Sequence, residues 1–130
     1  MRLERLAGPE LEELLARITR ALVAAFARER ILLFGSFARG DQNRASDVDL
    51  VIVARTDLPF VERIGRALER CYEVSDRVPV DVLVYTPREW RRMLAAGSSF
   101  AGEVLRTGRV LYERESESQR GAALAGPGTA

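Results

Sequence analysis

The sequence predicts an α/β domain, with a small mixed β-sheet and helices packed mainly on one face of that sheet. Short apolar runs rich in β-branched residues alternate with longer stretches in which apolar residues recur at helical spacing. The predicted strands lie at 31–34, 48–54, 79–85 and 110–112. At 130 residues, of which 47% are hydrophobic, the chain suits one core, so we expect a single domain over residues 1–114.

The first predicted helix begins at Gly8-Pro9-Glu10, where proline suits the first turn and glutamate suits the positive end of the helix. Its apolar positions repeat every three or four residues, which places them on one face. They are Leu11, Leu14, Leu15, Ile18, Leu22 and Phe26. We expect this face to cover the sheet.

A second predicted helix follows Asp57-Leu58-Pro59, between the second and third strands. Its predicted apolar face consists of Phe60, Val61, Ile64, Leu68, Cys71 and Tyr72. Because Cys71 lies on this stripe, we interpret it as a core residue and expect no disulfide.

The last third of the chain predicts two short helices and a tail. Residues 86–89, Thr-Pro-Arg-Glu, form a capping box for a helix over 87–94. A serine at position 98 or 99 can cap a further helix over 100–106. Residues 115–130 lack hydrophobic periodicity and are predicted to be disordered.

The turn after the first strand predicts a phosphate-binding site. An apolar strand ends at Gly35-Ser36, and a helical turn that begins there would direct unpaired amides toward a ligand. The Ser36 hydroxyl is expected to be the N-cap of this turn, and Gly35 would allow close approach to the backbone.

Two acids lead into the second strand. Asp47 and Asp49 are separated by one residue, so their side chains project from the same face of the strand. Two carboxylates at this spacing repel each other unless a cation lies between them. The pair therefore predicts a divalent metal site, and the alternative is a solvated entry to the strand.

A third acid, Asp81, is the one charged residue of the third predicted strand. If that strand lies beside the second, the three carboxylates can surround two hard cations in the arrangement used for in-line phosphoryl displacement. The alternative interpretation of Asp81 is an outward-facing acid near a sheet edge.

The order of Gly-Ser, Asp-x-Asp and a later lone Asp on a hydrophobic strand resembles the DNA polymerase β-like nucleotidyltransferase superfamily, over about residues 30 to 112. The short chain looks like the minimal nucleotidyltransferases (MNT) of prokaryotes. The resemblance implies the polymerase β-like nucleotidyltransferase fold. It also implies that Gly35 and Ser36 bind a triphosphate. It further implies that Asp47 and Asp49 ligate Mg²⁺ and that Asp81 helps to activate the acceptor hydroxyl.

The resemblance also implies a partner. Minimal family members are similar to the antitoxin half of a toxin–antitoxin pair whose other half is a helical HEPN-type ribonuclease, with AMP transferred to a tyrosine. Arg39 matches a position that contacts phosphate in some relatives, although a surface arginine is an ordinary alternative.

These features predict a Mg²⁺-dependent nucleotidyltransferase that transfers a nucleoside monophosphate, in the first instance AMP from ATP, to a hydroxyl of a partner protein. A second hypothesis is a non-catalytic antitoxin that neutralises its partner by binding. A third keeps the chemistry and changes the acceptor to a small molecule such as an aminoglycoside. The acceptor, the base preference and the oligomeric state cannot be read from the residues.

Composition excludes several alternatives. The 20 basic residues are all arginine, and the absence of histidine excludes histidine acid–base catalysis and histidine-ligated zinc. A formal net charge of +1 gives no general attraction to nucleic acid, so a template-dependent polymerase is not expected. We see no signal peptide or membrane span and expect a cytoplasmic protein.

Two further features of the helix after the third strand leave alternatives open. Trp90 could stack on a base or pack in the core. The cluster of Arg88, Arg91 and Arg92 could meet an acidic partner or RNA, or form a solvated helix face.

Overall fold

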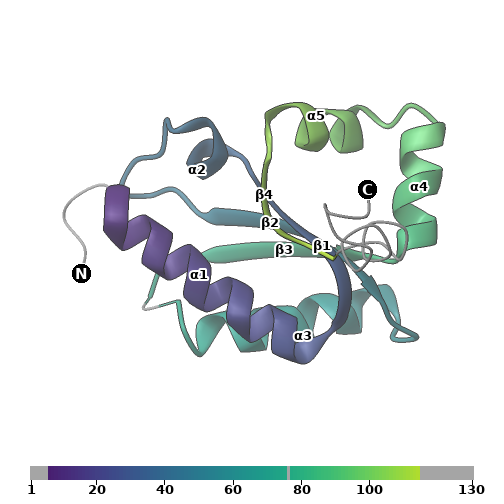
Figure 1. Cartoon of the computed structure of the whole chain (residues 1–130), viewed down its shortest axis with the longest axis horizontal. Coiled ribbons are helices and arrows are strands. Elements are labelled where there is room, and N and C mark those ends of the chain that lie inside the picture. Colours follow the sequence, from purple (N-terminus) through teal and green to yellow (C-terminus); the bar gives the residue numbers. More distant parts are fainter. Residues whose placement is uncertain (1–5, 76, 115–130) are drawn as a thin grey trace, which may run out of the picture.

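The structure, a computed structural model, describes residues 6–75 and 77–114 (Figure 1). Helices and strands alternate along the chain, as the hydrophobic pattern predicts. In order, they are α1 (Gly8–Ala25), β1 (Ala27–Phe34), α2 (Ser36–Arg39), β2 (Val48–Arg55), α3 (Phe60–Tyr72), β3 (Val80–Tyr85), α4 (Pro87–Ala95), α5 (Ser99–Thr107) and β4 (Arg109–Glu113).

Over the described residues the strands form one mixed sheet in the order β3-β2-β1-β4. Strand β1 is antiparallel to both β2 and β4, whereas β2 and β3 are parallel and are joined through α3. A parallel pair needs such a crossover, and the crossover brings the starts of β2 and β3 to the same end of the sheet. The predicted mixed sheet is confirmed.

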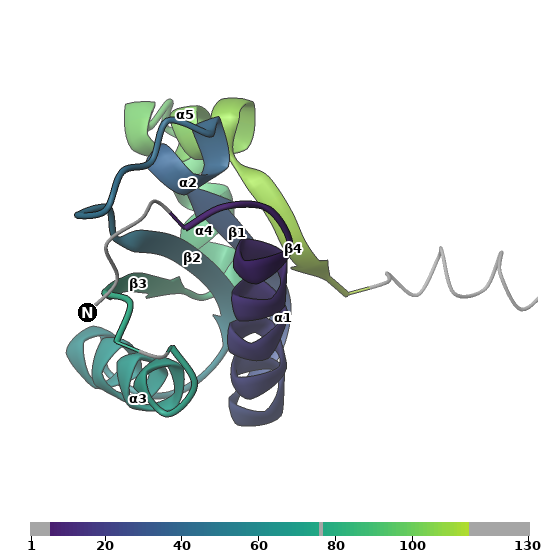
Figure 2. The same ribbon diagram turned by 90° about the vertical axis from the view of Figure 1, so that its left-hand side faces the viewer.

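The helices divide between the two faces of the sheet (Figures 1 and 2). The larger core joins α1 and α3 to alternate residues of β2 and β3, among them Val48, Leu50 and Val82. A smaller cluster on the other face joins α4 and α5 to Val51 and Val53. The larger helices therefore lie on one face, as expected, and α4 and α5 pack on the opposite face, on which Asp81 is exposed at the start of β3.

Strand β1 is longer than predicted. The apolar run predicts residues 31–34, whereas the strand begins at Ala27 and has a register shift against β2 between Arg28 and Arg30. A bulge of this kind interrupts the alternation of side chains, so the pattern of polar and apolar residues does not reveal the first half of the strand.

Local signals at the helix ends are accurate. The capping box of α4 is present, with Thr86 accepting from the Glu89 amide at 3.1 Å and Glu89 accepting from the Thr86 amide at 2.8 Å. The Ser98 side chain accepts from the Ala101 amide and caps α5. Both predicted helices therefore begin where their caps place them.

The predicted apolar face of α3 is partly wrong. Phe60, Val61 and Tyr72 are exposed, and the buried residues of the helix are Arg63, Ala67 and Cys71. The helix is rotated so that its small residues contact the sheet, while Arg63 finds polar partners that a core position normally lacks. Cys71 is a buried free thiol, as predicted, and burial raises its pKa to about 12.

The predicted disordered tail, residues 115–130, lies outside the described residues. Within residues 6–75 and 77–114, no helix is both long enough and apolar enough to cross a bilayer.

Candidate functional site

The turn after β1 is built around Gly35. This residue has φ 75° and ψ −156°, a conformation that side chains with a Cβ rarely adopt. Its carbonyl oxygen accepts hydrogen bonds from the amides of Ala38 and Arg39, each at 3.1 Å. The amides of Ser36 and Phe37 come before these donors, at the open end of the turn.

The predicted N-cap at Ser36 is wrong. Gly35 occupies the N-cap position, Ser36 is the first helical residue, and no side chain caps the turn. The reason is the positive φ of Gly35, which starts the helical turn one residue earlier than the serine suggests. The Ser36 hydroxyl is therefore not engaged as a cap.

Gly35 also lies directly against Asp49. The preceding residue, Phe34, is the antiparallel partner of Asp49, and a Cβ placed on Gly35 would collide with the Oδ2 atom of that carboxylate. Glycine is thus required here both by the backbone angle and by the contact. The turn and the Asp-x-Asp segment form one unit.

The three predicted acids lie at neighbouring positions. Asp49 and Asp81 are partners in the parallel pairing of β2 with β3, and Asp47 precedes β2 by one residue. The condition for bringing the three carboxylates together, that the third strand lies beside the second, is therefore met. Asp81 is exposed, and β3 is an edge strand of the described sheet, which agrees with the alternative of an outward-facing acid near a sheet edge. A metal-binding role for Asp81 stays a prediction.

Burial and the neighbouring acids raise the pKa of two of these carboxyl groups. Burial, followed by the charges of Asp81 and Asp47, raises the pKa of Asp49 to about 6, and the charge of Arg39 partly opposes this rise. Burial, the charge of Asp81 and a side-chain hydrogen bond with Asp81 raise the pKa of Asp47. Ionisation of Asp47 and Asp49 beside these neighbours therefore costs free energy, and a bound cation would offset that cost.

The chemistry of these donors suits magnesium, which prefers carboxylate oxygens. As the side chains stand, however, no group of three or more acidic, cysteine or histidine residues in the described chain converges closely enough to hold a metal ion. The backbone places Asp47, Asp49 and Asp81 side by side, and rotation of the side chains would have to complete a coordination shell.

Arg39 lies at the exposed end of α2. Its Nε atom is 3.2 Å from Asp41 Oδ2, and its charge acts on Asp49. The structure thus brings every predicted site residue into one region: the turn at Gly35 and Ser36, the acids, and Arg39.

Helix α4, which follows β3, carries the two features for which the sequence left alternatives open. Trp90 is 3% exposed and packs in the smaller core cluster, which confirms its packing role. Arg88, Arg91 and Arg92 are exposed on α4.

The acids have an aromatic neighbour that the sequence does not indicate. The sequence marks Phe34 only as the end of an apolar strand, yet the residue is half-buried and opposes Asp49. Its ring contacts Phe100 of α5, with centroids 5.4 Å apart. The alternation of β1 could have placed Phe34 on the acidic face, but nothing in the sequence places α5 beside it.

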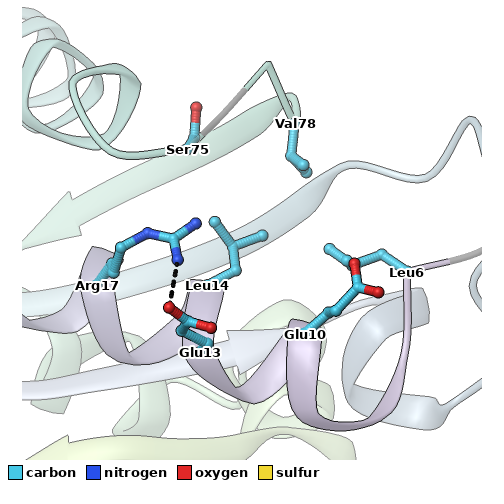
Figure 3. Close-up of a pocket in the computed structure, with 7 residues that line it drawn as sticks. All are labelled: Leu6, Glu10, Glu13, Leu14, Arg17, Ser75 and Val78. Atoms are coloured by element: carbon cyan, nitrogen blue, oxygen red, sulfur yellow. Dashed lines mark ion pairs between the residues drawn. The ribbon is translucent and has the colours of Figure 1, made fainter. Parts of the chain in front are cut away.

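A cavity lies away from the acids, between α1 and the segment before β3 (Figure 3). Its volume is about 150 Å³, and Arg17 and Glu13 form an ion pair at its edge. Ligand pockets usually measure roughly 300–1,000 Å³, so this one is too small for a nucleotide. It also lies on the face that α1 covers, away from Asp49 and Asp81.

Comparison with known proteins agrees with this geometry. Residues 14–107 match the family described as "Nucleotidyltransferase domain". A protein of Methanocaldococcus jannaschii named "Putative protein adenylyltransferase" is 34% identical over 84 residues, which cover 65% of this chain and 78% of that protein.

Solved structures share the fold. A toxin–antitoxin crystal structure with AMP-PNP has a TM-score of 0.57 at 23% identity, covering 88% of this chain and 82% of its own. A structure of a tri-AMPylated Shewanella oneidensis HEPN toxin with its MNT antitoxin has a TM-score of 0.53 at 19% identity, covering 91% and 82%. The family match covers residues 14–107, and the mixed sheet and the acids beside the glycine turn agree with it. The chain therefore belongs to the nucleotidyltransferase domain family.

Proposed function

We propose that this nucleotidyltransferase transfers AMP from ATP to a hydroxyl group of a partner protein and releases pyrophosphate, in a reaction that requires Mg²⁺. The observation that carries the proposal is the packing of Asp49 against Gly35, with Asp81 in register beside it. A phosphate-binding turn and a set of metal-binding carboxylates are the two halves of a nucleotidyl-transfer site.

The turn binds the triphosphate. The amides of Ser36 and Phe37 lie at its open end, and the Ser36 hydroxyl is not engaged as a helix cap. Gly35 exposes its backbone without a Cβ, which allows phosphate oxygens to approach. Arg39 adds a positive charge three residues along the turn, where it balances part of the charge of the ligand.

The acids hold the cations and receive the proton. Asp47, Asp49 and Asp81 would ligate Mg²⁺, which supplies charge neutralisation at the phosphates and increases the acidity of the acceptor hydroxyl. The acceptor oxygen forms a bond to the α-phosphorus as the bond to pyrophosphate breaks in line. Because the chain has no histidine or lysine, a carboxylate receives the proton, and we assign this role to the exposed Asp81.

The names of similar proteins support a protein acceptor. The M. jannaschii relative is named for protein adenylylation, and one structural neighbour is an AMPylated HEPN toxin in complex with an MNT antitoxin. We therefore propose a HEPN-type toxin as the partner and antitoxin action as the biological role.

One observation favours a second function, a binding module that neutralises its partner without chemistry. The acids, as they stand in the described structure, do not converge on a metal position. If binding alone were the function, variants of the acids would still protect cells from the partner.

Labelling of the copurified partner with α-³²P-ATP and Mg²⁺ tests the proposal. Wild type should label the partner, whereas Asp47→Asn combined with Asp49→Asn should lower labelling by on the order of a thousandfold or more. Asp57→Asn, an exposed acid before α3, is the matched control and should label normally. Undiminished labelling by the double variant would contradict the proposed chemistry.

A further inference from the structure

Phe34 lies beside the acidic site. It is the last residue of β1, and Asp49 is its antiparallel partner on β2. Directly opposed residues of such a pair share a face of the sheet, with Cβ atoms about 4.5–5.5 Å apart. The phenyl ring is therefore a neighbour of the Asp49 carboxylate, and it is only half-buried.

Phe100 packs against this ring. The two centroids are 5.4 Å apart and the ring planes are inclined at 86°, an edge-to-face pair. In such a pair the edge of one ring contacts one face of the other. The remaining ring faces take no part in this contact, so the contact itself does not prevent them from stacking on a base. Both rings lie at the margin of the smaller core cluster, and neither is fully buried.

The position of Phe100 is well fixed. The ring comes from the first turn of α5, where the Ser98 side chain accepts from the Ala101 amide at 3.2 Å and Ala101 is fully buried. Helix α5 lies at the same end of the molecule as α2 in both views (Figures 1 and 2). A capped and buried helix start thus holds the ring against Phe34, the residue that precedes the turn at Gly35.

The other aromatic side chains, all within the described residues, do not combine exposure with this position. Some are buried in the cores, some lie at the far end of β3 or on the face covered by α1 and α3. They are Phe26, Phe37 and Trp90 in the cores, Phe60 and Tyr85 at the far end, and Tyr72 and Tyr112 on the other face.

We propose that Phe100, supported by Phe34, is the stacking surface for the nucleobase of the donor nucleotide. This inference rests on the proposed function, because it requires a triphosphate at Gly35 and metal-bound phosphates at Asp49. With the phosphates there, the nucleoside needs an apolar, planar surface next to the acids, and the Phe34–Phe100 pair supplies one.

The expected energetic effect is moderate and does not depend on the base. Stacking of a base on an aromatic side chain corresponds to roughly a 5- to 100-fold change in affinity, and every base has a face that can stack. Phe100 should therefore strengthen the binding of ATP and GTP alike, and it should leave the binding of a ligand that has no base unchanged.

Calorimetric titration of the full chain in Mg²⁺ tests this, with ATP and inorganic triphosphate as the two ligands. Phe100→Leu keeps apolar packing and removes the ring, so it should weaken ATP about tenfold and leave triphosphate unchanged. Phe100→Trp should bind ATP at least as tightly as wild type. The matched control is Phe60→Leu, because Phe60 is 39% exposed and pairs with Tyr85 at the far end of β3.

Other results would overturn either the stacking role of Phe100 or the proposed function. Equal binding of ATP by wild type and Phe100→Leu overturns the stacking role, as does a parallel loss of ATP and triphosphate, which would show that the ring only supports the fold. ATP binding by Phe100→Trp weaker than that of wild type also overturns it. If wild type binds neither ligand, the proposed function itself fails.

Discussion

The two ends of β3 use charged side chains in contrasting ways. At its start, Asp81 lies beside Asp47 and Asp49, and burial and like charge raise the pKa of Asp49 to about 6. At its end, Arg63 and Glu89 form an ion pair at 2.7 Å, which holds the pKa of Glu89 below its usual value. Like charges held close together indicate a ligand site, whereas oppositely charged groups that pair indicate a structural contact. The contact of Arg63 with Glu89 is called the structural joint below.

The structural joint links three elements. Arg63 on α3 donates to the Leu58 carbonyl at 2.7 Å, to the Val84 carbonyl at 3.3 Å and to the Glu89 carboxylate at the start of α4. Arg63 is 8% exposed, so these bonds compensate the cost of burying its charge. The acidic end has no comparable compensation within the described residues.

The largest predicted effect on stability is at the structural joint. Arg63→Ala removes one hydrogen-bond donor from each of two carbonyls and from a partly buried carboxylate, and it should destabilise the fold by about 3 kcal/mol. Chemical denaturation measures this. The control is Arg70→Ala on the same helix, whose ion pair with Glu73 is exposed and should cost less than about 0.5 kcal/mol. Equal losses for the two variants would contradict the structural role of Arg63.

The second prediction compares two glycines that have no room for a Cβ. In Gly35→Ala the new methyl group meets Asp49, so activity should fall about 100-fold through displacement of the acid and the turn. In Gly108→Ala the methyl group meets the carbonyls of Val104 and Leu33, so the variant should lose stability instead. The activities of the two variants are compared by partner labelling at a temperature where both are folded. A larger loss of activity in Gly108→Ala than in Gly35→Ala would contradict the prediction.

The smallest predicted effect is a gain in stability. Asp49 has a pKa of about 6 in the folded protein, above its usual 3.8. As the pH rises from 3.8 to about 6, the carboxyl group ionises more readily in the unfolded chain, so the folded state loses stability. Asp49→Asn should therefore stabilise the metal-free protein at pH 7 by about 1 kcal/mol, after allowance for solvent screening. The gain should shrink as the pH falls toward 4. Thermal unfolding in EDTA at several pH values measures it, and a gain that is independent of pH would argue against the shifted carboxyl.

Much of the fold could be predicted because its signals are local. The caps at Thr86 and Ser98 and the alternation of β3 each depend on a few adjacent residues. That the third strand lies beside the second was only a condition of the predicted site; two apolar strands joined by a helix favour a parallel pair, but the register of Asp49 with Asp81 comes from the structure.

The remaining features depend on tertiary contacts. Arg63 is buried because carbonyls and a carboxylate from other segments meet it, and the pattern of α3 itself shows only a charge at that position. The position of Phe100 beside Phe34 depends on the packing of α5. The start of α2 depends on the backbone angle of Gly35, which the neighbouring serine obscured.

The proposed nucleotide site lies at the acidic end of β3, and the opposite end should bind no nucleotide. Thermal unfolding with ATP, in Mg²⁺ and in EDTA, tests it most directly. Wild type and Glu89→Gln should be stabilised by ATP only when Mg²⁺ is present, and Asp47→Asn combined with Asp49→Asn should show no ATP effect. An equal rise in melting temperature for the double aspartate variant, or for wild type in EDTA, would contradict the claim.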